Sequence, residues 1–195
     1  MTLKIRSVIA RSASDEAISI LATSPFAGMT IYMKEIVDVQ IGEVRTAKED
    51  VILKSKAIGS CIAVVAYDAR KRIGGMAHIM LPGIAPVNKN GSEKTKYAAN
   101  AIEALVDQMA QLGSNNGDIE VALAGGGNVL NRPDDTICRD NIRSTLRFLA
   151  KYDLAVKVQA IGGTNRRSVS LDVKGGIVFY TEGNGSETQL WRACG

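Results

Sequence analysis

The chain has 195 residues, of which 46% are hydrophobic and 23% charged, with a formal net charge of +4. That length suits one domain with a sizeable core, and no apolar run approaches the roughly 20 residues of a membrane span. Aromatic residues make up only 5% of the chain, which offers few platforms for stacking nucleic-acid bases. We therefore expect neither membrane insertion nor a nucleic-acid partner.

The cysteines are three in number and widely spaced, and there is a single histidine. This pattern excludes a disulfide framework and argues against a zinc site, so we expect no metal or cofactor and a reducing, cytoplasmic environment. Residues 1–28 lack the uninterrupted apolar core of a secretory signal. We interpret them as a mobile N-terminal extension, followed by a single domain over residues 29–195.

The sequence predicts strands in the first half of the chain. Residues 35–46 alternate between apolar and polar side chains, which predicts one strand with a solvated face, and a second apolar run covers residues 51–59. Over residues 59–82, two apolar runs flank a short charged tip, as in a β-hairpin. The first of these runs is apolar on both faces, which places it inside a layered fold.

Periodic apolar residues predict a helix over residues 94–112. Asp135 or Thr136 can cap a second helix that runs to about Lys151. Its expected buried stripe contains Cys138, Ile142, Leu146 and Leu149, which makes Cys138 a structural thiol. The remaining strands are expected over residues 119–124, 154–161, 167–173 and 177–181, with a short edge strand over 189–191.

Two features of this half have open interpretations. The glycines at positions 125–127 lack a Walker lysine, so a tight turn or a close backbone approach is favoured over a phosphate site. A ladder of cations follows another face of the second helix at every fourth position: Arg139, Arg143, Arg147 and Lys151. A solvated face is the default interpretation of the ladder, and an acidic protein partner is the alternative.

The central hairpin carries both residues of a candidate catalytic pair. Cys61 opens its first strand, and His78 lies near the end of its second. If residues 68–71 form a four-residue loop, Cys61 lies directly opposite His78 on one face. An imidazole at hydrogen-bond distance lowers the pKa of a thiol and accepts its proton, which would make the pair a nucleophile and its base. A buried cysteine and a structurally satisfied histidine are the alternative.

The residues just before Cys61 suit the same chemistry. Gly59 has no side chain to obstruct a substrate. The backbone N–H groups around Ser60 and Cys61 could face a developing oxyanion. Together these parts suit attack on an amide or ester carbonyl through a thioester.

Several segments resemble the signature of a known family, the chemoreceptor glutamine deamidases, CheD. The segments are Gly59-Ser60-Cys61-Ile62-Ala63-Val64, Tyr67-Asp68, Gly74-Gly75-Met76-Ala77-His78-Ile79-Met80-Leu81-Pro82, Lys94-Thr95-Lys96-Tyr97, Ala124-Gly125-Gly126-Gly127 and Ile161-Gly162-Gly163-Thr164-Asn165-Arg166-Arg167-Ser168-Val169. The similarity extends from about Ile36 to Phe179. The resemblance implies an α/β fold, a layered sandwich of mixed β-sheets flanked by helices.

The resemblance also implies an activity, the hydrolysis of glutamine side chains in the cytoplasmic region of methyl-accepting chemotaxis receptors to glutamate and ammonia. Cys61 matches the nucleophile of the family and His78 its general base. Where the family usually has a catalytic threonine, the only hydroxyl near the matching place is that of Ser55, which could orient the imidazole. The CheC phosphatase is an implied second partner.

Two other functions compete with this one. An adaptor that binds the receptor or the phosphatase without catalysis is the main alternative, because the threonine is missing. A thiol amidase acting on a small molecule is a weaker one, since no specificity pocket can be read from the sequence.

Overall fold

A computed structural model describes residues 34–134 and 136–193. Residues Ile36–Gly195 form one compact unit. The predicted extension over residues 1–28 and Cys194 lie outside the described residues. The strands are β1 (Glu35–Asp38), β2 (Val44–Lys48), β3 (Val51–Ile58), β4 (Ile62–Asp68), β5 (Ile73–Ile79), β6 (Ile119–Gly125), β7 (Ala155–Ile161), β8 (Arg167–Asp172), β9 (Ile177–Glu182) and β10 (Thr188–Arg192). The helices are α1 (Gly91–Lys94), α2 (Ala98–Gln111) and α3 (Ile137–Lys151), with a 3₁₀ turn at Asn116–Asp118.

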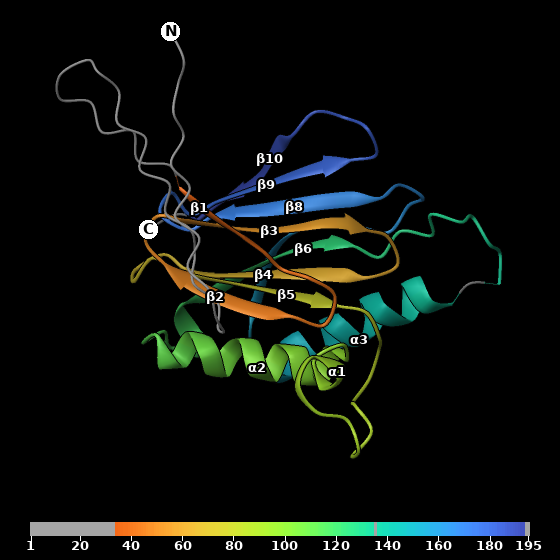
Figure 1. The fold of residues 1–195 in the computed structure, drawn as a ribbon, viewed down its shortest axis with the longest axis horizontal. Helices are drawn as coiled ribbons and strands as arrows, with labels where there is room; N and C mark the ends of the chain where they lie inside the picture. The colour runs from red at the N-terminus through yellow and green to blue at the C-terminus, as the bar shows by residue number, and fades with distance from the viewer. Residues whose placement is uncertain (1–33, 135, 194–195) are drawn as a thin grey trace, which may run out of the picture. The chain divides into compact units, whose positions relative to one another are not determined.

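The strands form two five-stranded sheets, in the orders β1-β3-β8-β9-β10 and β2-β5-β4-β6-β7. The second sheet is mixed, because β6 and β7 run parallel while its other pairs are antiparallel. Figure 1 shows α2 and α3 along one face of this second sheet. The predicted α/β layered sandwich is confirmed, with both long helices on the same side.

Strand β4 is buried on both faces, as its apolar sequence predicts. Ile62, Val64 and Ala66 pack in the core beneath the helices. Ala63, Val65 and Tyr67 pack in a second core, between the two sheets. Because side chains alternate along a strand, every residue of β4 is buried.

The single strand predicted over residues 35–46 is wrong. The chain forms β1 in one sheet, turns, and enters the other sheet as β2. Gly42 makes the turn possible with a φ of +78°, and a Cβ there would lie 2.5 Å from the carbonyl oxygen of Ser92. The turn is also hydrogen-bonded to β5. Gly42 N donates to His78 O at 2.9 Å, and His78 N donates to Glu43 O at 3.0 Å.

The hairpin of β4 and β5 forms, but its register differs from the predicted one by two residues. Asp68 pairs with Ile73, so the four-residue loop starts one residue later and Ala63, not Cys61, lies opposite His78. The reason lies at the tip, where Asp68 is fully buried and its Oδ1 accepts a hydrogen bond from Lys71 N at 3.1 Å. A shift of two residues preserves the faces of a strand, so Cys61 and His78 remain on the same face.

Both predicted helices form with adjusted ends. Helix α2 begins at Ala98, later than predicted, because Lys96 O accepts hydrogen bonds from Met80 N and Leu81 N and the preceding chain is therefore extended. In α3, Thr136 occupies the N-cap position without a side-chain capping bond. The buried face of α3 comprises Cys138, Asn141, Thr145, Phe148 and Leu149, whereas Ile142 and Leu146 of the predicted stripe are only half-buried.

Candidate functional site

The side chains of Ser55 and His78 meet between the two sheets. Ser55 lies on β3 and His78 on β5, and both are almost fully buried, at 1% and 3% exposure. Ser55 Oγ lies 2.8 Å from His78 Nδ1 and 3.0 Å from the carbonyl oxygen of Val39. The hydroxyl predicted to orient the imidazole is therefore in contact with it.

This contact assigns the tautomer of the ring. The carbonyl of Val39 can only accept, so the Ser55 hydroxyl donates to it and accepts a hydrogen bond from Nδ1–H of His78. The neutral ring then has its lone pair on Nε2. That atom is buried and has no hydrogen-bond partner within residues 34–134 and 136–193. It can accept a proton from an incoming group.

Burial also sets the charge of the ring. Loss of solvation lowers the pKa of His78 below its usual 6.5, and the carbonyl of Val39 opposes this shift only in part. At neutral pH the imidazole is therefore uncharged, which is the form that a general base requires.

Cys61 lies at the mouth of the same inter-sheet space. It directly precedes β4, is half-buried, and packs against the core between the sheets. Since Ala63 pairs with His78, Cys61 is the diagonal neighbour of His78 on one face, a relation with roughly 7–8 Å between Cα atoms. Its Sγ forms no hydrogen bond with Nε2 of His78.

The thiol is protonated in this arrangement. Burial raises the pKa of Cys61 above its usual 9.0, and its own backbone N–H opposes the shift only in part. The expectation that the imidazole lowers this pKa is not met, because the thiol and the ring are not in hydrogen-bond contact. The two groups therefore form a neutral thiol and a neutral base, without a preformed ion pair.

The loop before β4 is fixed by its carbonyl groups. Gly59 O accepts from Gly127 N at 2.8 Å, Ser60 O from Asn141 Nδ2 at 2.9 Å, and Cys61 O from Gly126 N at 2.7 Å. In the described part of the chain, the backbone N–H groups of Ser60 and Cys61 donate to no other residue. They are therefore free to bind a developing oxyanion, and that role stays a prediction.

The glycine turn after β6 exists because this loop passes against it. A Cβ at Gly125 would lie 2.3 Å from the carbonyl oxygen of Cys61, and one at Gly126 would lie 2.7 Å from Cγ1 of Ile142. The prediction of a close backbone approach is confirmed. A Cβ at Gly59 would lie 3.3 Å from Cγ2 of Val129, so protein lies close to this glycine on that side. The suggested role of Gly59 beside a substrate stays a prediction.

Asn141 of α3, which the sequence did not predict for the site, connects the chain just before β4 to the chain just after β5. Its side chain is fully buried and Nδ2 donates to Ser60 O at 2.9 Å and to Met80 O at 3.0 Å. These carbonyls lie just beyond the last pair of the β4–β5 ladder, Ile62 with Ile79. The available signal was a polar residue at a helical spacing from Cys138 on a buried face.

His78 lines a hollow of about 300 Å³ between the turn after β1 and the end of β3. The residues around it include Val39, Gln40, Lys54 and Lys56. Cys61 does not line this hollow, so the structure does not place the thiol and the ring in one common pocket.

Among the described residues, the helices are all too short or too polar to span a membrane.

The family model and the curated relatives that match this chain agree on one family. A family model described as CheD chemotactic sensory transduction matches residues 80–182, a span that starts after His78. A probable chemoreceptor glutamine deamidase CheD from Chlorobium luteolum is 41% identical over 150 residues, covering 77% of this chain and 74% of that protein. Proteins of the same description from Methanococcus maripaludis and Archaeoglobus fulgidus are 33% and 32% identical over 157 residues, covering 78% of this chain and 99% and 96% of theirs. Among solved structures, a hypothetical protein YfiH from Bacillus licheniformis matches with a TM-score of 0.40 and 14% identity over 65% of this chain and 60% of that one.

Proposed function

The chain belongs to the CheD family, and from this premise we propose that it deamidates glutamine side chains of chemoreceptors to glutamate. Cys61 acts as the nucleophile, His78 as the general base, and Ser55 as the group that orients His78. One observation carries the proposal: the buried imidazole has Nδ1 bound to Ser55 and Nε2 unpartnered, on the strand face that Cys61 shares.

Acylation begins when the substrate amide enters between Cys61 and His78. The sulfur attacks the amide carbon while its proton passes to Nε2 of His78, and a carbon–sulfur bond forms. The negative charge moves to the carbonyl oxygen, where the N–H groups of Ser60 and Cys61 can stabilise it. Because burial raises the pKa of the resting Cys61 thiol, the sulfur must give its proton to His78 in the course of acylation.

The same imidazole serves the loss of ammonia, which completes acylation, and the deacylation that follows. The imidazolium gives its proton to the amide nitrogen, the carbon–nitrogen bond breaks, and ammonia departs. The acyl group remains bound to Cys61 as a thioester. Water then attacks the thioester as His78 accepts a proton from it. The carbon–sulfur bond breaks, glutamate is released, and the sulfur regains its proton.

A second candidate is the adaptor that binds a receptor without catalysis. It is favoured by the absence of a hydrogen bond between Cys61 Sγ and His78 Nε2 in this structure. The enzymatic proposal therefore depends on a bound substrate bringing Cys61 Sγ within reach of His78 Nε2.

The experiment that separates the two functions uses the whole chain and a cytoplasmic receptor fragment. Ammonia release is followed in solution, and mass spectrometry maps glutamines converted to glutamate. The proposal expects stoichiometric ammonia and specific converted sites. Stable binding of the fragment with no ammonia and no converted site would support the adaptor and overturn the deamidase.

The proposal extends to location and to a second partner. The protein acts in the cytoplasm through residues 29–195, and a CheC-type phosphatase binds it in competition with the receptor. Inhibition of deamidation by added phosphatase, relieved by excess receptor fragment, is the expected result. Equal rates with and without the phosphatase would contradict this part.

A further inference from the structure

The exposed side of α3 carries a row of cations that have no carboxylate partner among the described residues, although Arg147 lies over the ring of Phe148. Arg139, Arg143, Arg147 and Lys151 follow each other at intervals of four residues, and all four are exposed. None forms an ion pair with another described residue. Elsewhere on the described chain, eight Lys and Arg side chains have carboxylate partners, while others, such as Lys48 and Arg72, also lack one. The eight are Arg45, Lys56, Arg70, Lys89, Lys96, Lys157, Arg167 and Lys174. What distinguishes α3 is that four such cations lie in one row.

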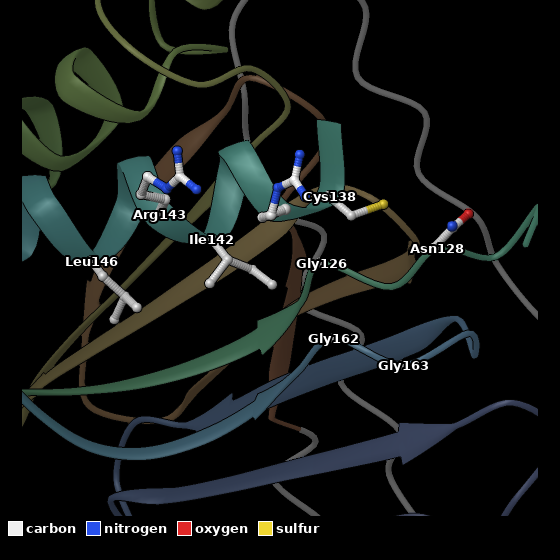
Figure 2. A pocket seen from close by; sticks show the side chains of 9 residues that line it. Gly126, Asn128, Cys138, Ile142, Arg143, Leu146, Gly162 and Gly163 are labelled. Atoms are coloured by element: carbon white, nitrogen blue, oxygen red, sulfur yellow. The ribbon is translucent and has the colours of Figure 1, made fainter. Parts of the chain in front are cut away.

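An apolar hollow borders the first half of this row. It has a volume of about 520 Å³, and its lining includes Ile142, Leu146, Arg139 and Arg143. In Figure 2, Ile142 and Leu146 point from α3 toward the strands, whereas the guanidinium of Arg143 points away from them. A side chain seated on the apolar floor would therefore lie beside a cationic rim.

The second half of the row borders another hollow, of about 580 Å³, lined by Gly83, Ile84, Arg147, Phe148 and Lys151. Ile84 is 68% exposed, which adds an unpartnered apolar side chain to its edge. The four cations thus lie along two hollows that both offer apolar contacts. Carboxylates on a partner can pair with such a row, and Arg binds them in a bidentate manner.

The same helix touches the candidate nucleophile. On its inner side, Asn141 binds the carbonyls of Ser60 and Met80, and Ile142 packs on the glycine whose N–H binds Cys61 O. A protein bound along the cationic row would therefore lie next to the backbone that carries Cys61.

We propose that Arg139, Arg143, Arg147 and Lys151 form a docking surface for an acidic, amphipathic segment of the protein substrate, adjacent in the substrate to the glutamine that is deamidated. This inference rests on the proposed function. Carboxylates of the segment pair with the row, and its apolar side chains fill the two hollows. Such a surface raises the association rate and selects the substrate, and the ionic part of its contribution weakens as salt increases.

The test is a double charge reversal, Arg143→Glu with Arg147→Glu. Its matched control is Lys48→Glu with Arg72→Glu, which changes the net charge equally at two exposed cations. Arg72 lies in the hairpin tip, at the opposite end of β4 from Cys61. Melting temperatures verify that both variants fold, and Arg143→Gln with Arg147→Gln replaces the reversal if it does not.

Deamidation kinetics are measured on a receptor fragment and on a short, neutral, blocked glutamine peptide. We expect the KM for the receptor fragment to rise roughly tenfold in the α3 variant, with kcat, and the rate on the neutral peptide, unchanged. An acidic peptide taken from the receptor should inhibit the wild type, and high salt should reduce the difference between the two proteins. An unchanged KM in the α3 variant would overturn the docking surface, and so would an equal rise in the control variant. Displacement of the substrate by nucleic acid but not by the acidic peptide would also overturn it.

Binding of the receptor fragment to Cys61→Ala separates this inference from the proposed function. If wild type releases no ammonia but Cys61→Ala binds the fragment and the charge reversal abolishes that binding, the deamidase proposal fails while the docking surface stands. If deamidation proceeds and the charge reversal leaves binding intact, the docking surface fails and the deamidase proposal stands.

Discussion

At the scale of single residues, the proposed mechanism assigns different roles to Ser55 and His78. In it, the Ser55 hydroxyl, which contacts Nδ1, orients the ring, and Nε2 takes up the proton. We expect Ser55→Ala to lower kcat about tenfold, as for loss of one hydrogen bond to the ring. His78→Ala should lower it by about 10²–10⁴-fold, because the base itself is lost. Ser55→Thr should retain most of the rate, and an unchanged kcat in Ser55→Ala would disprove the orienting role.

Burial of His78 predicts where activity fails in acid. Its pKa lies below 6.5, so the ring stays neutral while pH falls through 6.5 and is protonated only lower. The acidic limb of kcat/KM should therefore lie below pH 6.5. In the unfolded chain the ring takes up its proton first, so folding stability should also decline as pH falls below 6.5. An acidic limb above 6.5, in profiles recorded at constant ionic strength, would contradict the assignment.

At the scale of elements, α3 acts on the site through Asn141. Replacing this residue by alanine removes two hydrogen bonds that join the strand of Cys61 to the strand of His78. We expect a loss of about 1–3 kcal/mol in the free energy of unfolding and a lower kcat. Thr145→Ala is the matched control, since Thr145 is fully buried on the same helix but its hydroxyl has no described hydrogen-bond partner. Equal losses of kcat in the two variants would show that Asn141 contributes no more to catalysis than another buried residue of α3.

The glycine turn after β6 gives a second prediction for an element. In Gly125→Ala, the new methyl group would overlap the carbonyl of Cys61 at 2.3 Å, at a φ of +118°. We expect a cost of about 3 kcal/mol in stability and loss of activity, measured by chemical denaturation and ammonia release. Gly113→Ala has a similar φ of +106° but meets no atom within 4 Å, so it should cost only the backbone strain. Similar costs in both variants would show that backbone strain alone explains the glycine.

At the scale of the whole molecule, the sequence predicted the layers and most elements because their signals are local. The hairpin follows from two apolar runs around a charged tip, and the burial of β4 follows from its two apolar faces. The break between β1 and β2 was not predicted, although the alternation of Val37, Val39 and Ile41 changes phase at Gly42, before Val44. Gly42 makes the turn there with a φ of +78°.

The candidate site was predictable in its members but not in its geometry. The hairpin register depends on the buried carboxylate of Asp68, and two residues of register decide whether the thiol lies opposite or diagonal to the ring. The contribution of Asn141 depends on where α3 crosses the strand ends. A polar residue on the buried face of the helix signals a tertiary contact but does not identify its partners. The raised pKa of Cys61 likewise follows from burial and not from its sequence neighbours.

The central claim, that Cys61 is the nucleophile, is tested most directly by comparing two thiols. Initial rates of ammonia release from a receptor fragment are measured for wild type, Cys61→Ala and Cys138→Ala. Cys61 lies on the face that carries His78, whereas Cys138 lies on helix α3. We predict that Cys61→Ala folds normally and releases no ammonia, while Cys138→Ala keeps its activity and loses some stability through the cavity left in its buried position. Ammonia release by Cys61→Ala at the wild-type rate would contradict the thiol mechanism.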